Sequence, residues 1–502
     1  MPAFDSLSRL IGLLAAILGT YGASVYWRAG LSLSHYDAKA HLVVARRIFD
    51  SLTPSWEQIG AVWLPLPHVL NALPVQIDWM YRTGGSAIAI SIACYAITAA
   101  SLAQLIRTVT GSRTGAILAA ALFALNPNVL YLQSTPMTEP LLFALTTLVV
   151  LHLAQWVIAN EMPIRPAAGW TIVAACLTRY EAWPIVGAAM AIAALAKWLR
   201  GGRIDEVVRE IARLAIYPAL TVLFFLGLSF ASTGQWFVTG GFYVPDPKLQ
   251  GQPAAVWSEI RSGLVGLAGP RFVSALSIAI GVIALAAAVR KKWSAMLLPL
   301  ALLASVALPF YAFVSGHPFR IRYEVPLILG GAAAIGTAVS MLRWLAPLAA
   351  VPLVVMIQWQ TPMMSELSPM LIEAQLDRVN GAGRRTVTEC LQRSYDGTTI
   401  MASMGSLAHY MHELSNAGFD LKDFLHEGSG PIWQRAYYYE PSPFAGWVML
   451  EEAAEGGDML FQKQQSWPGF LAGYDRVCEG GNVALYRRKG SSPPKGSDPS
   501  PK

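Results

Sequence analysis

The sequence predicts a polytopic α-helical membrane protein with a small α/β domain at its C-terminal end. Of its 502 residues, 54% are apolar and only 14% are charged, whereas a soluble protein has about 25% charged residues. Long apolar runs recur until Trp359, and none follows it. After Trp359 the composition becomes that of a soluble domain, with Gly, Asp, Glu and Lys common. The chain is therefore expected to divide into a membrane part and an aqueous part.

Nine apolar runs have a length that suits a helix crossing a bilayer. They lie at residues 8–28, 86–106, 137–158, 183–199, 211–231, 271–289, 294–314, 323–342 and 344–358. Two shorter runs, at 114–125 and 167–178, leave open whether the chain crosses there; counting both gives about eleven transmembrane helices. The first run is about long enough to span a bilayer, so we expect a retained helix rather than a secretory signal.

The distribution of basic residues predicts the orientation of these helices. With eleven crossings, short loops dense in Arg and Lys fall on one side, and longer loops of lower density fall on the other. The dense side carries Arg107, Arg113, Arg165, Lys197, Arg200, Arg203, Arg209, Arg213, Arg290, Lys291, Lys292 and Arg343. Short loops rich in positive charge stay in the cytoplasm. The N-terminus is therefore predicted to be cytoplasmic and the C-terminal domain extracytoplasmic.

We assign residues 1–360 to the membrane domain, 361–489 to the α/β domain and 490–502 to a disordered tail. The tail, "GSSPPKGSDPSPK", has a composition that cannot build a core. "TTIMASMGSLAHYMHEL" is typical of a strand that leads into an amphipathic helix, and "GWVMLEE" and "NVALYRR" are typical of strands. If this domain faces an oxidising compartment, Cys390 and Cys478 can form a disulfide, although two cysteines are also often free thiols.

Polar residues gather in four groups at the predicted outer ends of the apolar runs. These groups are "HYDAKAH" in the first loop, "STPMTEPLLF", "LTRYEAWP" and "HPFRIRYEVP". Ionisable side chains are costly inside a bilayer, so those at the rim of a helix bundle mark candidate functional sites. We expect the four groups to converge on one site.

Asp37 and Glu139 are the candidate catalytic residues. Each has a structural alternative, because an acid at the start of a helix also stabilises that helix as a cap or through its dipole. Asp37 precedes an amphipathic stretch over 38–52 that predicts a helix at the membrane interface, and Glu139 is followed by Pro, as in many helix starts. A single carboxylate suffices for capping, whereas a pair beside cations favours proton transfer next to an anion.

Arg320, Arg322 and Tyr323 are the candidate phosphate ligands. The guanidinium group is planar, permanently charged and suited to phosphate oxygens. These residues stand where a predicted span leaves the membrane, at the height of lipid headgroups. The alternative is that Arg and Tyr anchor the helix at the interface.

Five further residues are candidates for contact with a substrate. Two of them, an Arg and a Glu in "LTRYEAWP", can equally form an ion pair within their own loop. The five are Lys39, His41, Arg179, Tyr180 and Glu181.

Other kinds of site leave no clear pattern in the sequence. Asp37 and His41 would share a helix face, which permits a metal site, but such a site normally needs a third protein ligand. The sequence has no H-E-x-x-H, clustered Cys or Asp-x-Asp pattern, so a divalent metal is not indicated. It also has no Gly-rich phosphate loop, no G-x-S-x-G and no motif that stacks on or reads nucleic acid. A phosphate bound here is expected to belong to a lipid.

The chain resembles the GT-C superfamily of integral-membrane glycosyltransferases. Within it, the sequence is similar to the protein-mannosyltransferase, aminoarabinose-transferase and RgtA/B/C/D-like group. The resemblance covers about residues 1–360 and rests on the order and spacing of "YDAKAHLVVARRI", "PMTEPLL", "LTRYEAWP" and "FRIRYEVP". The commonest first-loop pattern of the group is an Asp-Glu pair, and here Ala38 follows Asp37.

The resemblance implies a GT-C-like fold and a hexosyl- or pentosyltransferase that uses a polyprenyl-phosphate sugar donor. The first-loop acid, which acts as catalytic base or binds the acceptor, corresponds to Asp37, and a second acid corresponds to Glu139. Arg320, Arg322 and Tyr323 correspond to the residues that bind the donor's phosphate. The acceptor would be a hydroxyl of a glycan, lipid or protein at the outer face of a bacterial inner membrane, and direct displacement predicts inversion.

Two other classes of function stay open. A transporter or flippase for a lipid-linked or amphiphilic substrate is one, although transporters tend to place polar residues at the bilayer midplane in repeated halves. A membrane-anchored scaffold whose outer domain binds a partner is the other. In a scaffold, Asp37 and Arg322 would be dispensable.

Overall fold

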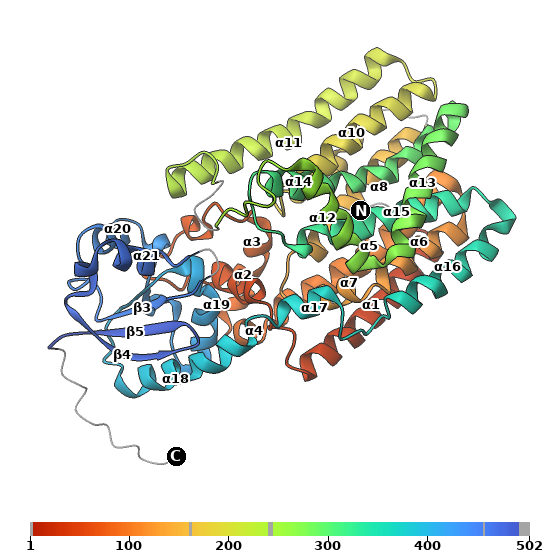
Figure 1. Ribbon diagram of the computed structural model, residues 1–502. Coiled ribbons are helices and arrows are strands. Elements are labelled where there is room, and N and C mark those ends of the chain that lie inside the picture. The colour runs from red at the N-terminus through yellow and green to blue at the C-terminus, as the bar shows by residue number, and fades with distance from the viewer. Residues whose placement is uncertain (1–3, 160–162, 239–243, 455–456, 491–502) are drawn as a thin grey trace.

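The computed structural model describes residues 4–159, 163–238, 244–454 and 457–490. The chain forms an elongated bundle of helices with an α/β domain at one end (Figure 1). The expected disordered tail lies, from residue 491 onward, outside the described residues.

Helices long and apolar enough to cross a membrane number eight within the described ranges. They are α1 (Ser6–Arg28), α5 (Gly85–Thr110), α8 (Glu139–Ile158), α10 (Ala182–Leu199), α11 (Ile204–Thr233), α13 (Pro270–Val289), η3 with α14 (Lys291–Val314) and η4 with α15 (Ile321–Ser340). Another apolar helix, α16 (Ala346–Gln360), follows the short turn η5 (Arg343–Leu345). The prediction of a multi-pass helical membrane protein is confirmed.

Two shorter apolar helices, α6 (Arg113–Ala124) and α9 (Pro166–Cys176), correspond to the two ambiguous runs. At 1.5 Å per residue they are about 17 Å long, less than the roughly 30 Å hydrocarbon layer. Nevertheless, Arg179 after α9 lies 3.1 Å from Glu139 at the start of α8, so α9 returns the chain to the end of the bundle where α8 begins. The total of eleven crossings stays a prediction.

The bundle is closely packed where small residues meet. A Cβ atom added at Gly336 of α15 would lie 2.6 Å from the carbonyl oxygen of Gly115 in α6. Small residues at a helix crossing let two backbones approach in this way. Substituting either glycine would therefore force α6 and α15 apart.

Between α1 and α5, the chain forms a layer of short helices that joins the bundle to the α/β domain (Figure 1). It comprises α2 (Tyr36–Arg46), η1 (Trp56–Ile59), α3 (Leu66–Ala72), η2 (Pro74–Gln76) and α4 (Asp78–Thr83). The helix predicted over 38–52 is thus shorter than expected. The chain turns after Arg46, the last residue of α2, whose Nε donates to Asp50 Oδ2 at 2.8 Å.

Three more helices pack against the bundle: two lie between spans, and the third follows the last span, within residues 361–489. They are α7 (Pro127–Leu132), α12 (Pro253–Ala268) and α17 (Pro369–Ala374). The helix α12 occupies the long loop after α11, and it packs against η4 (Ile321–Glu324).

The C-terminal domain is a five-stranded sheet with the order β2-β1-β3-β5-β4. Its strands are β1 (Ile400–Ala402), β2 (Phe424–Leu425), β3 (Trp447–Glu451), β4 (Tyr474–Gly480) and β5 (Val483–Arg488), and its helices are α18 (Arg378–Ser394), α19 (Met404–Leu414), α20 (Pro431–Tyr438) and α21 (Met459–Ser466). β1 is parallel to β2 and β3, whereas β5 is antiparallel to β3 and β4. The predicted α/β character is confirmed, and β1 leads into α19 as expected. The boundary at residue 361 stays a prediction.

Cys390 of α18 and Cys478 of β4 are joined by a disulfide, as one of the two alternatives expected. The bond closes a loop of 88 residues, which restricts the unfolded chain. We expect the double variant Cys390→Ser, Cys478→Ser to lose about 2–5 kcal/mol of unfolding free energy. Denaturant titration measures this loss. Cys94→Ser together with Cys176→Ser, at two buried free cysteines, controls for the replacement of cysteine by serine without loss of a bridge. An unbridged pair in non-reducing mass spectrometry would contradict the assignment.

Three buried histidines of the α/β domain make its stability sensitive to acid. Burial lowers the pKa of His409 and His412 to about 4 and that of His426 to about 3. The unfolded chain, with an ordinary His pKa near 6.5, therefore binds more protons below that pH than the folded domain does. We expect the unfolding free energy to fall as the pH drops from 6.5 toward 4, by up to about 1.4 kcal/mol per pH unit for each histidine.

Thermal unfolding at several pH values tests this acid sensitivity. The variant His412→Gln keeps a donor for the carbonyl of Tyr81, which His412 Nε2 contacts at 3.0 Å. The unfolding free energy of this variant should fall less steeply with decreasing pH, by the contribution of one histidine. An unchanged slope would show that His412 titrates normally in the folded state.

Candidate active site

The first loop and the start of α15 meet in a direct ion pair. Arg322 Nη1 of η4 donates to Asp37 Oδ2 of α2, across 285 residues of sequence. Both side chains are nearly buried, with exposed fractions of 8% and 12%. The structure thus brings together the two residues that carry most of the predicted chemistry.

Glu139 extends this contact into a row of alternating charges. Its Oε1 lies 3.1 Å from Arg179 Nη1 and 3.5 Å from Arg322 Nε, and its side chain is fully buried. Arg179 Nη2 also contacts Glu181 Oε1 at 2.6 Å. We call the five residues Asp37, Arg322, Glu139, Arg179 and Glu181 the ion-pair chain. It holds three carboxylates against two guanidinium groups, and it joins the starts of α2, α8, α10 and α15.

Helix capping does not explain the carboxylates of Asp37 and Glu139. The cap of α2 is His35, whose Nδ1 accepts the backbone N–H of Asp37 at 3.1 Å. At the start of α8, Thr138 Oγ1 accepts from Arg179 Nη1 at 2.9 Å, and the Glu139 carboxylate faces the two arginines. The carboxylates are therefore committed to guanidinium groups rather than to their own helices.

The charge state of Asp37 follows from its surroundings. Burial, the largest single influence, acts to raise the pKa of its carboxyl group, but the Arg322 guanidinium together with His35 and His41 outweighs burial. The pKa of Asp37 consequently lies well below its usual range. Asp37 is an ionised partner of Arg322, and it is a weak base while that ion pair lasts.

Tyr323 and Arg320 lie beside Arg322. The guanidinium carbon of Arg322 is 5.6 Å from the ring centre of Tyr323, within the range of a cation–π contact. Arg320 is half-buried and acts on Glu373. Burial raises the pKa of Glu373, but a hydrogen bond from His35 and the charges of Arg322 and Arg320 hold it below its usual value. The predicted phosphate ligands thus lie together, beside the carboxylates of Asp37 and Glu373.

Two of the predicted substrate contacts have structural partners instead. Lys39 Nζ pairs with Glu413 Oε1 of α19 at 2.5 Å, so it joins α2 to the α/β domain outside the ion-pair chain. Tyr180 donates its hydroxyl to the carbonyl oxygens of Ala61 and Val62, each at 3.3 Å. It thereby holds the segment between η1 and α3 near the site.

His41 belongs to an aromatic cluster that the sequence did not reveal. Its Nδ1 lies 3.1 Å from His68 Nε2, and the ring of Trp63 lies 4.1 Å from its own. His68 and Trp63 come from "WLPLPH", which carries no recognisable spacing. Within the described ranges, no group of three His, Cys, Asp or Glu side chains is arranged to hold a metal ion.

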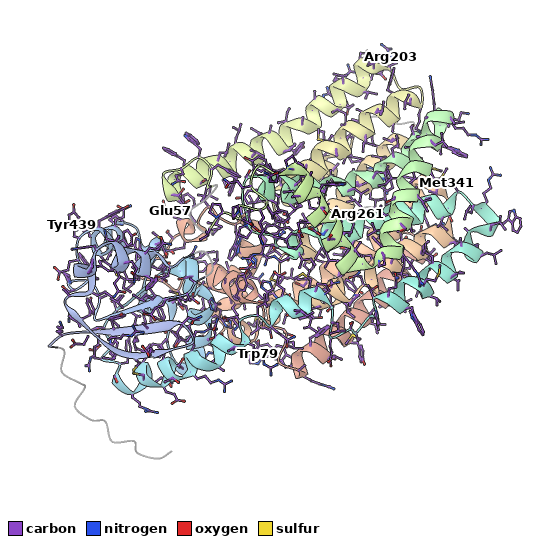
Figure 2. The ribbon with its side chains drawn as sticks, in the orientation of Figure 1. Glu57, Trp79, Arg203, Arg261, Met341 and Tyr439 are labelled. Carbon is purple, nitrogen blue, oxygen red and sulfur yellow. A yellow bond between two sulfur atoms is a disulfide. The ribbon has the colours of Figure 1, made fainter. Side chains whose placement is uncertain are left out.

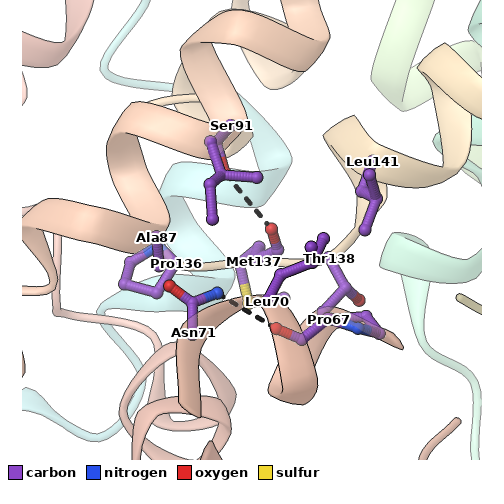
Figure 3. Close-up of a pocket in the computed structure, with 10 residues that line it drawn as sticks. Pro67, Leu70, Asn71, Ala87, Ser91, Pro136, Met137, Thr138 and Leu141 are labelled. Atoms are coloured by element: carbon purple, nitrogen blue, oxygen red, sulfur yellow. Dashed lines mark hydrogen bonds between the residues drawn. The ribbon is translucent and has the colours of Figure 1, made fainter. Parts of the chain in front are cut away.

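A small pocket adjoins the ion-pair chain at Thr138, the residue that Arg179 contacts. It lies between α3, α5 and the start of α8, and most of its lining is apolar (Figure 3). Two polar side chains of the lining are satisfied by backbone: Asn71 Nδ2 donates to the carbonyl of Pro67 at 3.0 Å, and Ser91 Oγ donates to that of Met137 at 3.4 Å. These two polar groups of the small pocket are therefore already paired within the protein.

Comparison with solved structures identifies the fold. No family model matches the sequence, and no curated protein does. ArnT from Cupriavidus metallidurans in the apo state is similar with a TM-score of 0.55 and 11% identity, over 94% of this chain and 97% of that one. The same ArnT bound to undecaprenyl phosphate has a TM-score of 0.59 and 10% identity, over 95% of this chain and 98% of that one.

The likeness covers the helical bundle and the α/β domain alike, because it spans nearly the whole of both chains. ArnT is an aminoarabinose transferase of the GT-C superfamily. At about a tenth of residues identical, the likeness establishes the fold. The expectation that arose from the four short motifs is confirmed: this multi-pass membrane protein has the GT-C fold.

Proposed function

We propose that the protein is a glycosyltransferase that moves a sugar from a polyprenyl-phosphate donor to an acceptor hydroxyl. The observation that carries this proposal is the buried contact between Asp37 and Arg322, with Glu139 as the second partner of the arginine. The GT-C fold supports it, and one similar structure, that of ArnT, is bound to undecaprenyl phosphate. The sugar would be a hexose or a pentose.

Arg322 would hold the phosphate that leaves. Breaking the bond between the anomeric carbon and the phosphate oxygen leaves negative charge on the phosphate, and a preorganised guanidinium stabilises that charge in the transition state. Arg322 already faces two carboxylates, so a phosphate competes with Asp37 for the same fork. Arg320 and Tyr323 would complete the phosphate site.

Asp37 would act on the acceptor. Once a phosphate has drawn Arg322 away, the carboxylate loses the main cation that lowers its pKa and becomes a stronger base. It can then take the proton of an acceptor hydroxyl as the hydroxyl oxygen attacks the anomeric carbon. This displacement inverts the configuration at that carbon.

Glu139 would keep the arginines in place. Because its Oε1 contacts both Arg179 and Arg322, it fixes their spacing when Asp37 turns to the acceptor. Glu181 anchors the far side of Arg179 at 2.6 Å.

The site would face the outside of a bacterial inner membrane. Figure 2 shows Arg203 and Met341 at the end of the bundle that is remote from the α/β domain. Arg203 belongs to the dense basic loops that predict the cytoplasmic side. The ion-pair chain lies at the opposite end, next to the α/β domain, through α2 and its contact with α19.

The test is an assay of purified protein in lipid nanodiscs with a panel of synthetic polyprenyl-phosphate hexoses and pentoses. Glycan, lipid and peptide acceptors are supplied, and mass spectrometry measures the release of polyprenyl phosphate and the glycosylated product. We expect at least one donor to be consumed with a product of inverted configuration. Movement of labelled donor across liposomes without any cleavage would instead support a transporter, and would overturn the proposal.

A further inference from the structure

Two buried histidines beside Asp37 form a hydrogen-bonded pair with a defined direction. His68 Nδ1 lies 3.2 Å from the carbonyl oxygen of Leu64, which can only accept, so His68 Nδ1 carries the hydrogen. Burial lowers the pKa of His68 to about 3, so its ring is neutral and its Nε2 has a lone pair. That Nε2 lies 3.1 Å from His41 Nδ1, which must therefore donate.

The direction of these bonds fixes the tautomer of His41. With its hydrogen on Nδ1, His41 keeps an unprotonated Nε2. This nitrogen has no hydrogen-bond partner in the part of the chain that the structure describes. His41 is also the more accessible member of the pair, with an exposed fraction of 7% against 1% for His68. The pair thus ends in a free basic nitrogen.

That nitrogen belongs to the site of the ion-pair chain. Asp37 and His41 are four residues apart on α2, so they share one face of the helix. The charged groups that act on His41 are Asp37 from its own helix, Arg322 from η4 and Arg179 from the segment before α10, with His68 from α3 behind it. Burial, and then His68, lower the pKa of His41, whereas Asp37 acts to raise it. The ring is consequently neutral in the resting site, and it becomes a stronger base once a phosphate neutralises Arg322, whose charge also lowers its pKa.

We propose that His41 Nε2 receives the proton that leaves the acceptor hydroxyl. This inference rests on the proposed transferase function and assigns the proton's destination. The acceptor's O–H bond breaks and its oxygen bonds to the anomeric carbon, while the bond from that carbon to the phosphate oxygen breaks with both electrons on the phosphate. The proton passes from the hydroxyl to Asp37 and then to His41 Nε2, and the imidazolium later returns it to water.

Electrostatics favour this destination at the moment of transfer. When the phosphate takes Arg322, Asp37 loses its main cationic partner. An imidazolium at His41 restores a positive charge on the same face of α2. His68 positions His41 by accepting from Nδ1, and the half-buried ring of Trp63, 4.1 Å from the imidazole, limits the entry of water. The carboxylate and the imidazole then function as a pair.

The variant His41→Gln tests the proposal, because glutamine keeps an amide donor for His68 and removes the basic nitrogen. We expect kcat to fall by about 100-fold or more, while the affinity for polyprenyl phosphate changes less than about 3-fold. In the wild type, kcat should fall as the pH drops, with a slope of one proton. This acid limb should shift in His41→Gln, where only Asp37 titrates.

Chemical rescue separates proton transfer from a packing role. In His41→Ala, added imidazole should restore part of kcat, and a series of substituted imidazoles should follow their pKa values. The matched control is His152→Gln, a histidine of equal exposed fraction, 7%. It lies in α8, thirteen residues beyond Glu139, or about 20 Å along the helix. It should leave kcat and the pH profile unchanged.

The outcomes distinguish this inference from the proposed function. If His41→Gln keeps kcat within about 3-fold of the wild type while Asp37→Asn is inactive, His41 is not the proton acceptor and the transferase function stands. An acid limb that stays at the wild-type pH in His41→Gln also overturns the inference. If the wild type consumes no polyprenyl-phosphate donor, the proposed function fails first.

Discussion

Replacing Arg322 with glutamine is expected to lower the rate of sugar transfer by about 100- to 1,000-fold. The guanidinium is the group in direct contact with both Asp37 and Glu139, and glutamine cannot neutralise a leaving phosphate. Steady-state kinetics with a polyprenyl-phosphate sugar measure the change. The variant Arg322→Lys should retain the charge but lose the planar fork, and its rate should fall between those of the wild type and Arg322→Gln.

The controls for Arg322 separate catalysis from folding. Arg322→Gln leaves two carboxylates near the site without their main partner, so thermal unfolding must show that the variant is folded. Arg261→Gln removes an exposed arginine of α12 (Figure 2) and should keep full activity. Equal activity of Arg322→Gln and the wild type would show that Arg322 does not stabilise the leaving phosphate.

Asparagine at position 37 is expected to abolish transfer with little loss of stability. The amide keeps the shape of the side chain and can still accept from Arg322, but it takes up no proton. We expect kcat to fall by about 100- to 10,000-fold. A loss of activity that comes with unchanged or stronger binding of the donor would place Asp37 in the chemical step rather than in binding.

The matched control for Asp37 is Asp205→Asn in α11. Asp205 pairs with Arg203 at 3.0 Å, as Asp37 pairs with Arg322, but both residues of this pair are largely exposed. Arg203 also lies at the far end of the bundle (Figure 2). We expect this variant to transfer sugar at the wild-type rate, because exposed ion pairs contribute little. If Asp37→Asn behaves like Asp205→Asn, the first-loop acid has no role in transfer.

The sequence predicted the meeting of Asp37, Glu139 and Arg322 because charge is rare in this chain. Ionisable residues at the same end of apolar runs have few stable places except a shared site. The predicted pairing of Arg179 with Glu181 in its own loop is also present, at 2.6 Å. Arg179 of that pair also contacts Glu139. The ion pair within the loop and the contact with the candidate site are therefore both present.

Other features had no signal in the sequence. His68 stands between prolines and leucines in "LPLPHVL", and only the fold brings it to His41. Glu413 looks like any acid on an amphipathic helix, yet it pairs with Lys39 and with Arg384. Lys39 and Glu413 lie 374 residues apart in the sequence, and His41 and His68 lie 27 residues apart. Neither distance matches a local pattern that could have predicted the contact.

The helix lengths show where local rules fall short. The apolar spacing of residues 38–52 is helical, but α2 ends at Arg46. Arg46 reaches Asp50 and also Asp78 of α4, at 2.8 Å in each case. The apolar periodicity predicted that a helix begins here. It did not predict where the helix ends, which is at Arg46, the residue that pairs with Asp50 and Asp78.

Binding of a polyprenyl monophosphate tests the central claim most directly, because the claim is that phosphate displaces Asp37 at Arg322. Undecaprenyl phosphate is titrated into wild-type protein, Arg322→Gln and Asp37→Asn in nanodiscs, and bound lipid is counted by native mass spectrometry. The account predicts affinity at least about 10-fold weaker in Arg322→Gln and severalfold tighter in Asp37→Asn, where the competing carboxylate is gone. Equal affinity in all three proteins would contradict it.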